Sequence, residues 1–257
     1  MSDQLVLERS DSVLIMRLNR PEARNALTGA LVRQISTTLL DAEADPATRV
    51  LVITGTGDRA FCGGMDLADF ADTGDDEFSD LDAMEGFRRL LDGDLALPVI
   101  GAANGSAVAG GFELLLGCDI IVASSEARFG LPEVKRGLFA IGGGTHLGQR
   151  LPLAIALELT LTGDYIDAQR AAQLGLVNKT VEPEHVMTSA LEYAHRIAAN
   201  GPLAVSATKE LVRLGITDHA RARVRISELK DTIFNSDDAK EGAIAFIEKR
   251  PPIGRGK

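Results

Sequence analysis

The stretch Asn104-Gly-Ser-Ala-Val-Ala-Gly-Gly-Phe-Glu113 follows the apolar run Pro98–Ala103 and leads into the helix-like segment Phe112–Leu116. A short apolar run bounded by turn residues predicts a buried strand. We therefore predict a strand, a glycine-rich turn and a helix in this order. The same order recurs along the chain, which indicates an α/β fold with parallel strand pairing.

Other segments extend this pattern. Apolar, β-branched runs predict strands at Val13–Leu18, Val50–Thr54 and Ile120–Ala123, and Thr28 is expected to cap a helix between the first two. Beyond about Leu151 the strand signals fade and helical periodicity replaces them. Such terminal amphipathic helices commonly pack on the main body or on another subunit. The expected helices are Leu153–Leu161, Ala168–Leu174, Glu184–Ala199, Leu203–Leu214, His219–Phe234 and Asp237–Lys249.

Length, composition and charge limit the possible functions. The 257 residues, 45% apolar and 25% charged, are enough for one sizeable core. The net charge of -10 argues against a broad nucleic-acid or anionic-membrane surface, since such partners bind through Lys and Arg. No apolar run approaches the roughly 20 residues that span a bilayer, and residues 1–9 do not resemble a signal peptide. We expect a cytoplasmic protein without a nucleic-acid or membrane partner.

Three features favour structural explanations over chemistry. Cys62 and Cys118 lie in apolar or glycine-rich runs without CxxC spacing, so we expect buried, reduced thiols. The four histidines are scattered, and we expect them at solvated helix positions rather than on a metal ion. Residues 69–82 are crowded with Asp, Glu, Gly and Ser, which predicts an exposed, mobile loop, with a lid as the alternative.

Two glutamates beside glycine-rich turns, Glu113 and Glu133, are candidates for acid/base chemistry. Glu133 ends the stretch Phe129-Gly-Leu-Pro-Glu133. A carboxylate next to backbone that glycine leaves open can be held against a bound substrate. The alternative for each is an ordinary turn or a helix cap.

Backbone amides near these glutamates are candidates for an oxyanion hole. In Phe61-Cys-Gly-Gly-Met-Asp-Leu67, the paired glycines let the backbone turn sharply and point the Met65 N–H inward. Gly110 precedes a helix whose dipole favours negative charge. Two amides aimed at one oxygen can stabilise a developing negative charge there.

Other signatures of enzyme classes are absent from the sequence. Gly142-Gly-Gly-Thr-His-Leu-Gly148 lacks the GxGxxG spacing of a dinucleotide site and lies late in the chain. No GxxxxGK[ST] occurs, so a P-loop nucleotidase is unsupported. Ser106 does not lie in the GxSxG elbow of a serine hydrolase.

Four segments taken together resemble a known family. They are Asn19-Arg-Pro-Glu-Ala-Arg-Asn-Ala-Leu27, the Phe61–Leu67 block, the Asn104–Glu113 stretch and Leu161-Thr-Gly-Asp-Tyr-Ile166. In this order they look like the enoyl-CoA hydratase (crotonase) family, and the resemblance runs from about Leu14 to Arg250. It implies a crotonase-like spiral of β-β-α units over residues 1–195. It also implies a C-terminal helical trimerisation region, 196–257, that builds homotrimers or homohexamers.

The resemblance also implies a reaction. Glu113 would activate a water that attacks C3 of a trans-2-enoyl-CoA, and Glu133 would supply the proton to C2, giving a 3-hydroxyacyl-CoA. The N–H groups of Met65 and Gly110 would bind the thioester oxygen. No metal or separate cofactor is implied, because coenzyme A enters with the acyl-CoA substrate. By position, the residues expected along the CoA and thioester are Ala23, Arg24, Ala26, Ala60, Gly64, Asp66 and Leu67.

The chain departs from the family pattern in three places. Hydratases often have a Pro-Gly pair after the second glutamate, whose amide helps to position the water, whereas this chain has Phe139-Ala140-Ile141 before Gly142. Leu131 stands where some hydratases have glutamine, and Met65 replaces a smaller residue. A 3,2-enoyl-CoA isomerase using only Glu133 is the nearest alternative, and a non-catalytic acyl-CoA-binding protein is another. The presence of both glutamates favours hydration.

Overall fold

The computed structural model describes residues 3–68 and 82–257, and its largest sheet has six strands in the order β1-β2-β3-β5-β7-β10. β1 and β2 form an antiparallel hairpin, and the other neighbours pair in parallel. The predicted parallel core is therefore confirmed. The strands are β1 (Leu5–Ser10), β2 (Val13–Leu18), β3 (Val50–Gly55), β5 (Val99–Ala103), β7 (Ile120–Ser124) and β10 (Lys179–Val181).

A second sheet has four strands in the order β4-β6-β8-β9. Its strands alternate along the chain with those of the first sheet, so β3 is followed by β4, β5 by β6 and β7 by β8. Each such pair gives one strand to each sheet, and β6 leads directly into α4. The expected β-β-α spiral is thus confirmed. The strands are β4 (Ala60–Cys62), β6 (Ser106–Val108), β8 (Arg128–Gly130) and β9 (Ile166–Asp167).

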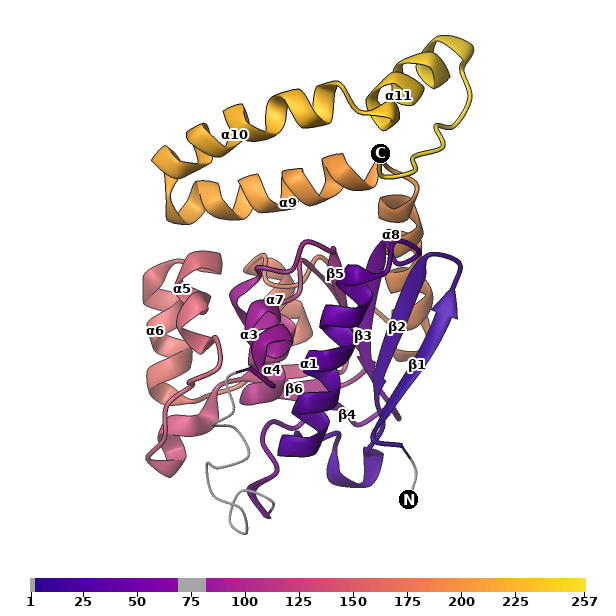
Figure 1. Ribbon diagram of the computed structural model, residues 1–257. Helices are drawn as coiled ribbons and strands as arrows, with labels where there is room; N and C mark the ends of the chain where they lie inside the picture. The colour runs from indigo at the N-terminus through magenta and orange to yellow at the C-terminus, as the bar shows by residue number, and fades with distance from the viewer. Residues whose placement is uncertain (1–2, 69–81) are drawn as a thin grey trace.

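Helices surround the sheets and form a separate C-terminal layer (Figure 1). Thr28 caps α1 as predicted, since its side chain accepts a hydrogen bond from the Leu31 amide at 3.1 Å. The helices are α1 (Gly29–Ala44), α3 (Glu85–Asp92), α4 (Gly110–Leu116), α5 (Leu147–Arg150), α6 (Leu153–Thr162), α7 (Ala168–Gln173), α8 (Val186–Ala198), α9 (Pro202–Thr217), α10 (His219–Phe234) and α11 (Asp237–Glu248). Short 3₁₀ turns are η1 (Pro21–Ala23), η3 (Pro132–Arg136), η4 (Gly144–His146) and η5 (Pro183–His185).

Both faces of the central strands are buried, which explains their continuous apolar sequence. In β3, Val50 and Val52 join an apolar cluster with α8, whereas Leu51 and Ile53 face the larger cluster between sheet and helices. The alternation follows from the two-residue period of a strand. Cys62 and Cys118 are free and buried, as predicted.

Several sequence expectations need correction. Strand structure does not end at Leu151, because β9 and β10 follow it, and β1 precedes the first predicted strand. β9 and β10 have only two and three residues, too few for a periodic signal. The predicted loop at 69–82 lies outside the described residues except for its last position. Within the described part of the chain, no helix is long and apolar enough to cross a bilayer.

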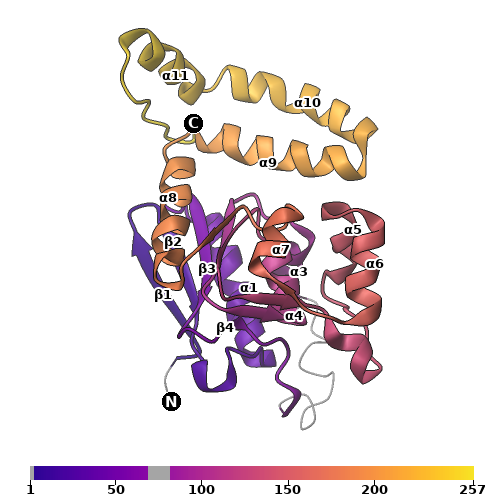
Figure 2. The same cartoon turned by 180° about the vertical axis from the view of Figure 1, so that it is seen from behind.

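The C-terminal helices α9, α10 and α11 lie above the sheets in both views (Figures 1 and 2). Lys209 of α9 joins this layer to the body by donating to the Leu97 carbonyl at 2.7 Å and pairing with Asp119 at 2.8 Å. The expected division at residue 195 stays a prediction, and α8 spans that position.

A close approach of α4 to β4 fixes the start of this helix. A Cβ at Gly111 would overlap the backbone carbonyl of Cys62. We expect Gly111→Ala to lower the free energy of unfolding by about 1–3 kcal/mol, because the helix must move away from the strand. Chemical denaturation would measure the loss.

Gly215 in α9 provides the matched control. A Cβ there meets nothing within 4 Å. Gly215→Ala should therefore be neutral or stabilising by up to about 1 kcal/mol through helix propensity. Equal losses for the two variants would contradict the close-packing explanation.

Candidate active site

The Glu113 carboxyl is held by two backbone amides from a distant loop. Its Oε1 accepts from Gly142 N and Gly144 N, each at 2.8 Å. Glu113 lies in the first turn of α4 and is 5% exposed. A Cβ at Gly142 would lie 2.9 Å from Oε2, so only glycine allows this approach without displacement. One oxygen is thereby fixed.

Opposing effects act on Glu113. Burial raises the pKa of its carboxyl, while the Gly144 and Gly142 amides and the nearby His146 partly lower it. The net shift is upward. Charge-assisted hydrogen bonds from backbone amides favour the ionised form of a carboxyl. The amides of Gly142 and Gly144 therefore lower the free-energy cost of ionising Glu113 in its buried position.

Glu133 lies in the first turn of η3, directly after buried Pro132. Its Oε2 is buried and has no hydrogen-bond partner among residues 3–68 and 82–257. Burial raises the pKa of Glu133, and the charge of Glu113 raises it further. The two carboxyls are therefore close enough to interact, and an unpartnered buried oxygen points to a group that a substrate can satisfy.

The amides of Met65 and Gly110 lie beside Glu113. A Cβ built on Gly110 would be 3.8 Å from Met65 N and 3.9 Å from Glu113 Oε2. Gly110 begins α4, so its N–H is among those that a helix leaves without an intrahelical acceptor. The preceding residue, Ala109, has φ of 52°, a strained conformation that turns the chain into the helix at this point.

A parallel bridge to Leu27 fixes Met65. Leu27 N donates to Gly64 O and Asp66 N donates to Leu27 O, both at 2.8 Å. Within the described part of the chain, the Met65 amide itself donates no hydrogen bond. It therefore remains available to an acceptor near Gly110.

The predicted CoA segment also lies against residues 63–66. Gly63 N donates to Arg24 O at 2.9 Å, and Arg20 pairs with Asp66 at 2.9 Å. Arg24 is exposed, while Asp66 is engaged by Arg20 rather than open to solvent. The structure thus brings the two predicted segments together. The remaining predicted residues are partly buried Ala23 and Ala26, buried Ala60 and Gly64, and exposed Leu67.

Sequence reasoning missed the residue that organises this corner. Asn25 is fully buried with φ of 54°, and its side chain accepts from Arg20 N and donates to Ala60 O at 2.8 Å. The available signal was its position after a proline-containing turn, since Asn tolerates left-handed backbone and bonds locally. Asn25 links the turn at η1 to β4.

The loop that departs from the family pattern is the one that holds Glu113. In the sequence, residues 139–144 show only a departure from the family pattern and a glycine spacing unlike that of a nucleotide site, and neither feature predicts a contact with Glu113. His146 was also misjudged, because it is half-buried in η4 and its Nδ1 lies 3.2 Å from Leu91 O. Leu131 is 1% exposed and packs behind Gly144.

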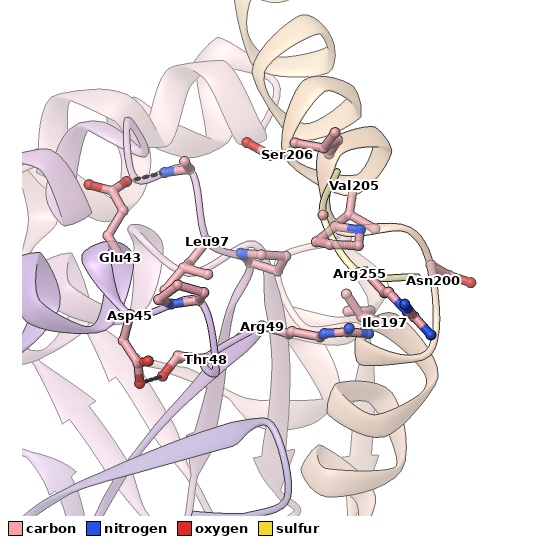
Figure 3. A pocket seen from close by; sticks show the side chains of 16 residues that line it. Glu43, Asp45, Thr48, Arg49, Leu97, Ile197, Asn200, Val205, Ser206 and Arg255 are labelled. Atoms are coloured by element: carbon pink, nitrogen blue, oxygen red, sulfur yellow. Dashed lines mark hydrogen bonds between the residues drawn. The ribbon is translucent and has the colours of Figure 1, made fainter. Parts of the chain in front are cut away.

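A separate cavity of about 230 Å³ contains none of these residues. Figure 3 shows its polar groups, with Glu43 bonded to a backbone amide and Asp45 to Thr48. Arg49 donates to Ala198 O at 2.9 Å and to Gly254 O, so this region anchors the C-terminal tail. No cluster of three metal-ligating side chains occurs in the described ranges.

Comparisons with known proteins agree with this architecture. A family model described as enoyl-CoA hydratase/isomerase matches residues 8–255. The chain is 40% identical to a carnitinyl-CoA dehydratase of Proteus mirabilis over 100% of both chains. It is 36% identical to a short-chain-enoyl-CoA hydratase of Clostridium acetobutylicum over 96% of both. A crystal structure of enoyl-CoA hydratase from Mycobacterium tuberculosis H37Rv superposes with a TM-score of 0.91, 41% identity and 99% coverage of both chains.

The raised pKa of Glu133 predicts a stability effect. Well below its unfolded pKa of 4.5 the carboxyl is protonated in both states, so ionisation adds no penalty to folding. As the pH rises above 4.5 the unfolded state ionises first, and the penalty on the fold grows until the pH has passed the raised folded pKa. Glu133→Gln should therefore raise Tm by about 2 °C near neutral pH, with the gain disappearing near the unfolded pKa.

Differential scanning calorimetry across this pH range would measure the effect. The control is Glu158→Gln on the exposed face of α6, which should leave Tm within about 1 °C. A Tm gain for Glu133→Gln that is independent of pH would contradict the electrostatic cause.

Proposed function

This chain belongs to the enoyl-CoA hydratase/isomerase family, and from that premise we propose that it hydrates a trans-2-enoyl-CoA to a 3-hydroxyacyl-CoA. One observation carries the proposal. A Cβ built on Gly110 would lie within 4 Å of both Met65 N and Glu113 Oε2, so these two groups border the same side of Gly110. A thioester bound against that side would meet an amide donor and a carboxylate at the same time.

The two amides would stabilise the enolate-like oxygen that forms during addition. Water attack at C3 moves negative charge onto the thioester oxygen, and Met65 N–H and Gly110 N–H would donate to it. Removing one such donor typically costs about 3–4 kcal/mol of transition-state stabilisation. The helix dipole of α4 favours the same charge at Gly110.

The environments of the glutamates support different roles. Glu113 receives two amide bonds on Oε1, which favours the carboxylate and leaves Oε2 to accept a proton from water. Glu133 has an unpartnered buried oxygen and a pKa raised by burial and by Glu113. It is therefore suited to deliver a proton to C2. Separated acid and base roles are what this addition requires.

The substrate's CoA portion would lie along the surface formed by residues 23–27 and 60–67. Exposed Arg24 could pair with a phosphate, and Leu67, 51% exposed, could cover the pantetheine. Ala23, Ala26, Ala60 and Gly64 would allow close approach. Asp66 would act by holding Arg20 against Ala26 O, where Arg20 donates at 2.7 Å.

The alternatives keep this site and change its use. A 3,2-enoyl-CoA isomerase needs one proton shuttle, whereas the amide contacts to Glu113 favour a second active carboxylate. The relative named carnitinyl-CoA dehydratase indicates the reverse direction as well, since hydration and dehydration share one transition state. A silent acyl-CoA-binding protein would not use the carboxyls at all.

No resident cofactor is needed for this reaction, because base, acid and amide donors all come from the chain. A cytoplasmic location remains a prediction, supported by two buried free thiols, which persist in reducing compartments. The net charge of -10 continues to argue against a nucleic-acid partner.

We expect Glu113→Gln and Glu133→Gln each to lower kcat by at least about 100-fold, since general acid or base catalysis supplies that much. Loss of the enoyl absorbance of crotonyl-CoA would measure hydration, with carnitinyl-CoA and a 3-enoyl-CoA assayed in parallel. CoA affinity should change little. Glu158→Gln is the control with full activity.

A wild-type protein that consumes only the 3-enoyl-CoA would support the isomerase instead. Binding without turnover of any of these thioesters would support the silent carrier. Activity retained by Glu113→Gln would contradict its role as the base.

A homotrimer or homohexamer is the assembly that we propose. Large apolar side chains are exposed on the C-terminal helices, including Val212, Ile216, Phe234, Phe246 and Ile247, and a monomer would leave this surface in water. Light scattering after size exclusion should give about three or six times the 27.3 kDa chain mass. A concentration-independent monomer would contradict the proposal.

A further inference from the structure

The helix that carries Glu113 is tied at its opposite end to the segment that holds the Glu113 carboxyl. Arg150 is the last residue of α5, and its Nη1 donates to Leu116 O at 2.8 Å and to Cys118 O at 3.4 Å. Carbonyls at a helix C-terminus lack intrahelical donors. A guanidinium there satisfies them and meets the negative end of the helix dipole.

We propose that Arg150 is a positioning residue that holds the Gly142–Gly144 turn against α4 and so keeps two amides on Glu113. Its catalytic meaning rests on the proposed hydratase function. The structural tie itself does not depend on that function.

The geometry consists of two neighbouring segments joined at both ends. Residues 142–150 run from the two glycine amides through η4 and α5 to Arg150. On α4, Glu113 lies in the first turn and Leu116 is the last residue. A single tie would let the turn rotate about the Glu113 carboxyl. Two ties, at Glu113 and at Leu116 one helical turn further along α4, restrict that motion.

The other contacts of this turn do not replace Arg150. His146 Nδ1 lies 3.2 Å from Leu91 O, and buried Leu147 packs in the core, but neither contacts the end of α4 through a hydrogen bond in the described residues. α5 lies below α9 in both views, away from the C-terminal tail (Figures 1 and 2). Apart from the two amide bonds to Glu113, the hydrogen bonds in the described residues that join residues 142–150 to the C-terminal end of α4 come from Arg150.

Arg150 contributes by holding the backbone at the end of α4, and its charge does not shift the pKa of Glu113. Among the neighbouring side chains, the electrostatic contribution that lowers the Glu113 pKa comes from His146, and Arg150 is not among the causes. Around Arg150 lie Asp119 and Arg213, and Asp119 is already paired with Arg213 at 2.7 Å. Burial lowers the pKa of Arg150, yet a guanidinium stays protonated in proteins. Its hydrogen bonds go to carbonyls.

Arg213 is a matched control from the other side of the same helix end. Its Nη2 donates to Gly117 O at 3.3 Å, and its guanidinium pairs with Asp119. It belongs to α9, however, and has no continuity with the Gly142–Gly144 turn. Its removal should loosen the C-terminal layer without moving the two amides.

Hydrogen exchange of the substrate-free protein tests the tie directly. In Arg150→Met, peptides covering residues 140–147 should exchange roughly 5- to 10-fold faster than in the wild type, because the amides of Gly142 and Gly144 lose their fixed acceptor. Peptides of β2 and β3 serve as the internal reference and should not change. Arg213→Gln should leave residues 140–147 unchanged.

The pH profile of hydration adds a functional readout. Losing the amide bonds raises the Glu113 pKa, so the acid limb of kcat/KM should move up by about half a unit to one unit in Arg150→Met. We expect kcat to fall about 10- to 100-fold, with KM little changed. Arg150→Lys keeps one donor group and should give an intermediate kcat and an intermediate shift of the acid limb. It replaces Arg150→Met in the test if the methionine variant does not fold.

Unchanged exchange at residues 140–147 in both Arg150 variants would overturn the proposal. So would an equal effect of Arg213→Gln, or faster exchange that extends to β2 and β3, because either would indicate a general structural role. If the wild type turns over no enoyl-CoA, the proposed function fails, while the exchange result still decides the role of Arg150.

Discussion

The structure depends on one constraint, namely that a buried carboxylate must receive hydrogen bonds where water cannot supply them. Glu113 meets it by accepting from Gly142 N and Gly144 N, both at 2.8 Å. Glycine is needed at residue 142 because a Cβ would press on the carboxyl. The spiral fold serves this contact, since it brings a turn that follows β8 back to the helix that follows β6. The residues that make this contact are far apart in the sequence, so local sequence signals do not reveal it.

Several features of the candidate site lower the stability of the folded protein. Glu133 keeps an unpartnered buried oxygen, Ala109 holds a strained backbone, and both carboxyls have raised pKa values. Each is unfavourable in the protein by itself, and in the proposed mechanism the two carboxyls are used on a bound thioester. The apolar clusters on both faces of β3 provide the stability that offsets them.

Much of the fold was predictable because its signals are local. Continuous apolar runs marked β2, β3, β5 and β7, and Thr28 marked the start of α1. β9 and β10 were missed because two or three residues carry no period, and their pairing depends on strands distant in the chain. The glycine neighbours of the two glutamates mark them as candidates, and their catalytic roles stay a prediction. The Gly142–Gly144 contact and the roles of Asn25 and Arg150 were not predictable, because they depend on tertiary approach alone.

A crystal structure with a non-reactive acyl-CoA thioester bound tests the central claim most directly. The account predicts the thioester oxygen at about 2.7–3.1 Å from both Met65 N and Gly110 N, with Glu113 Oε2 and Glu133 Oε2 on the two sides of the C2–C3 bond. A thioester bound with its oxygen away from these amides, or with either carboxyl turned from the C2–C3 bond, would contradict it.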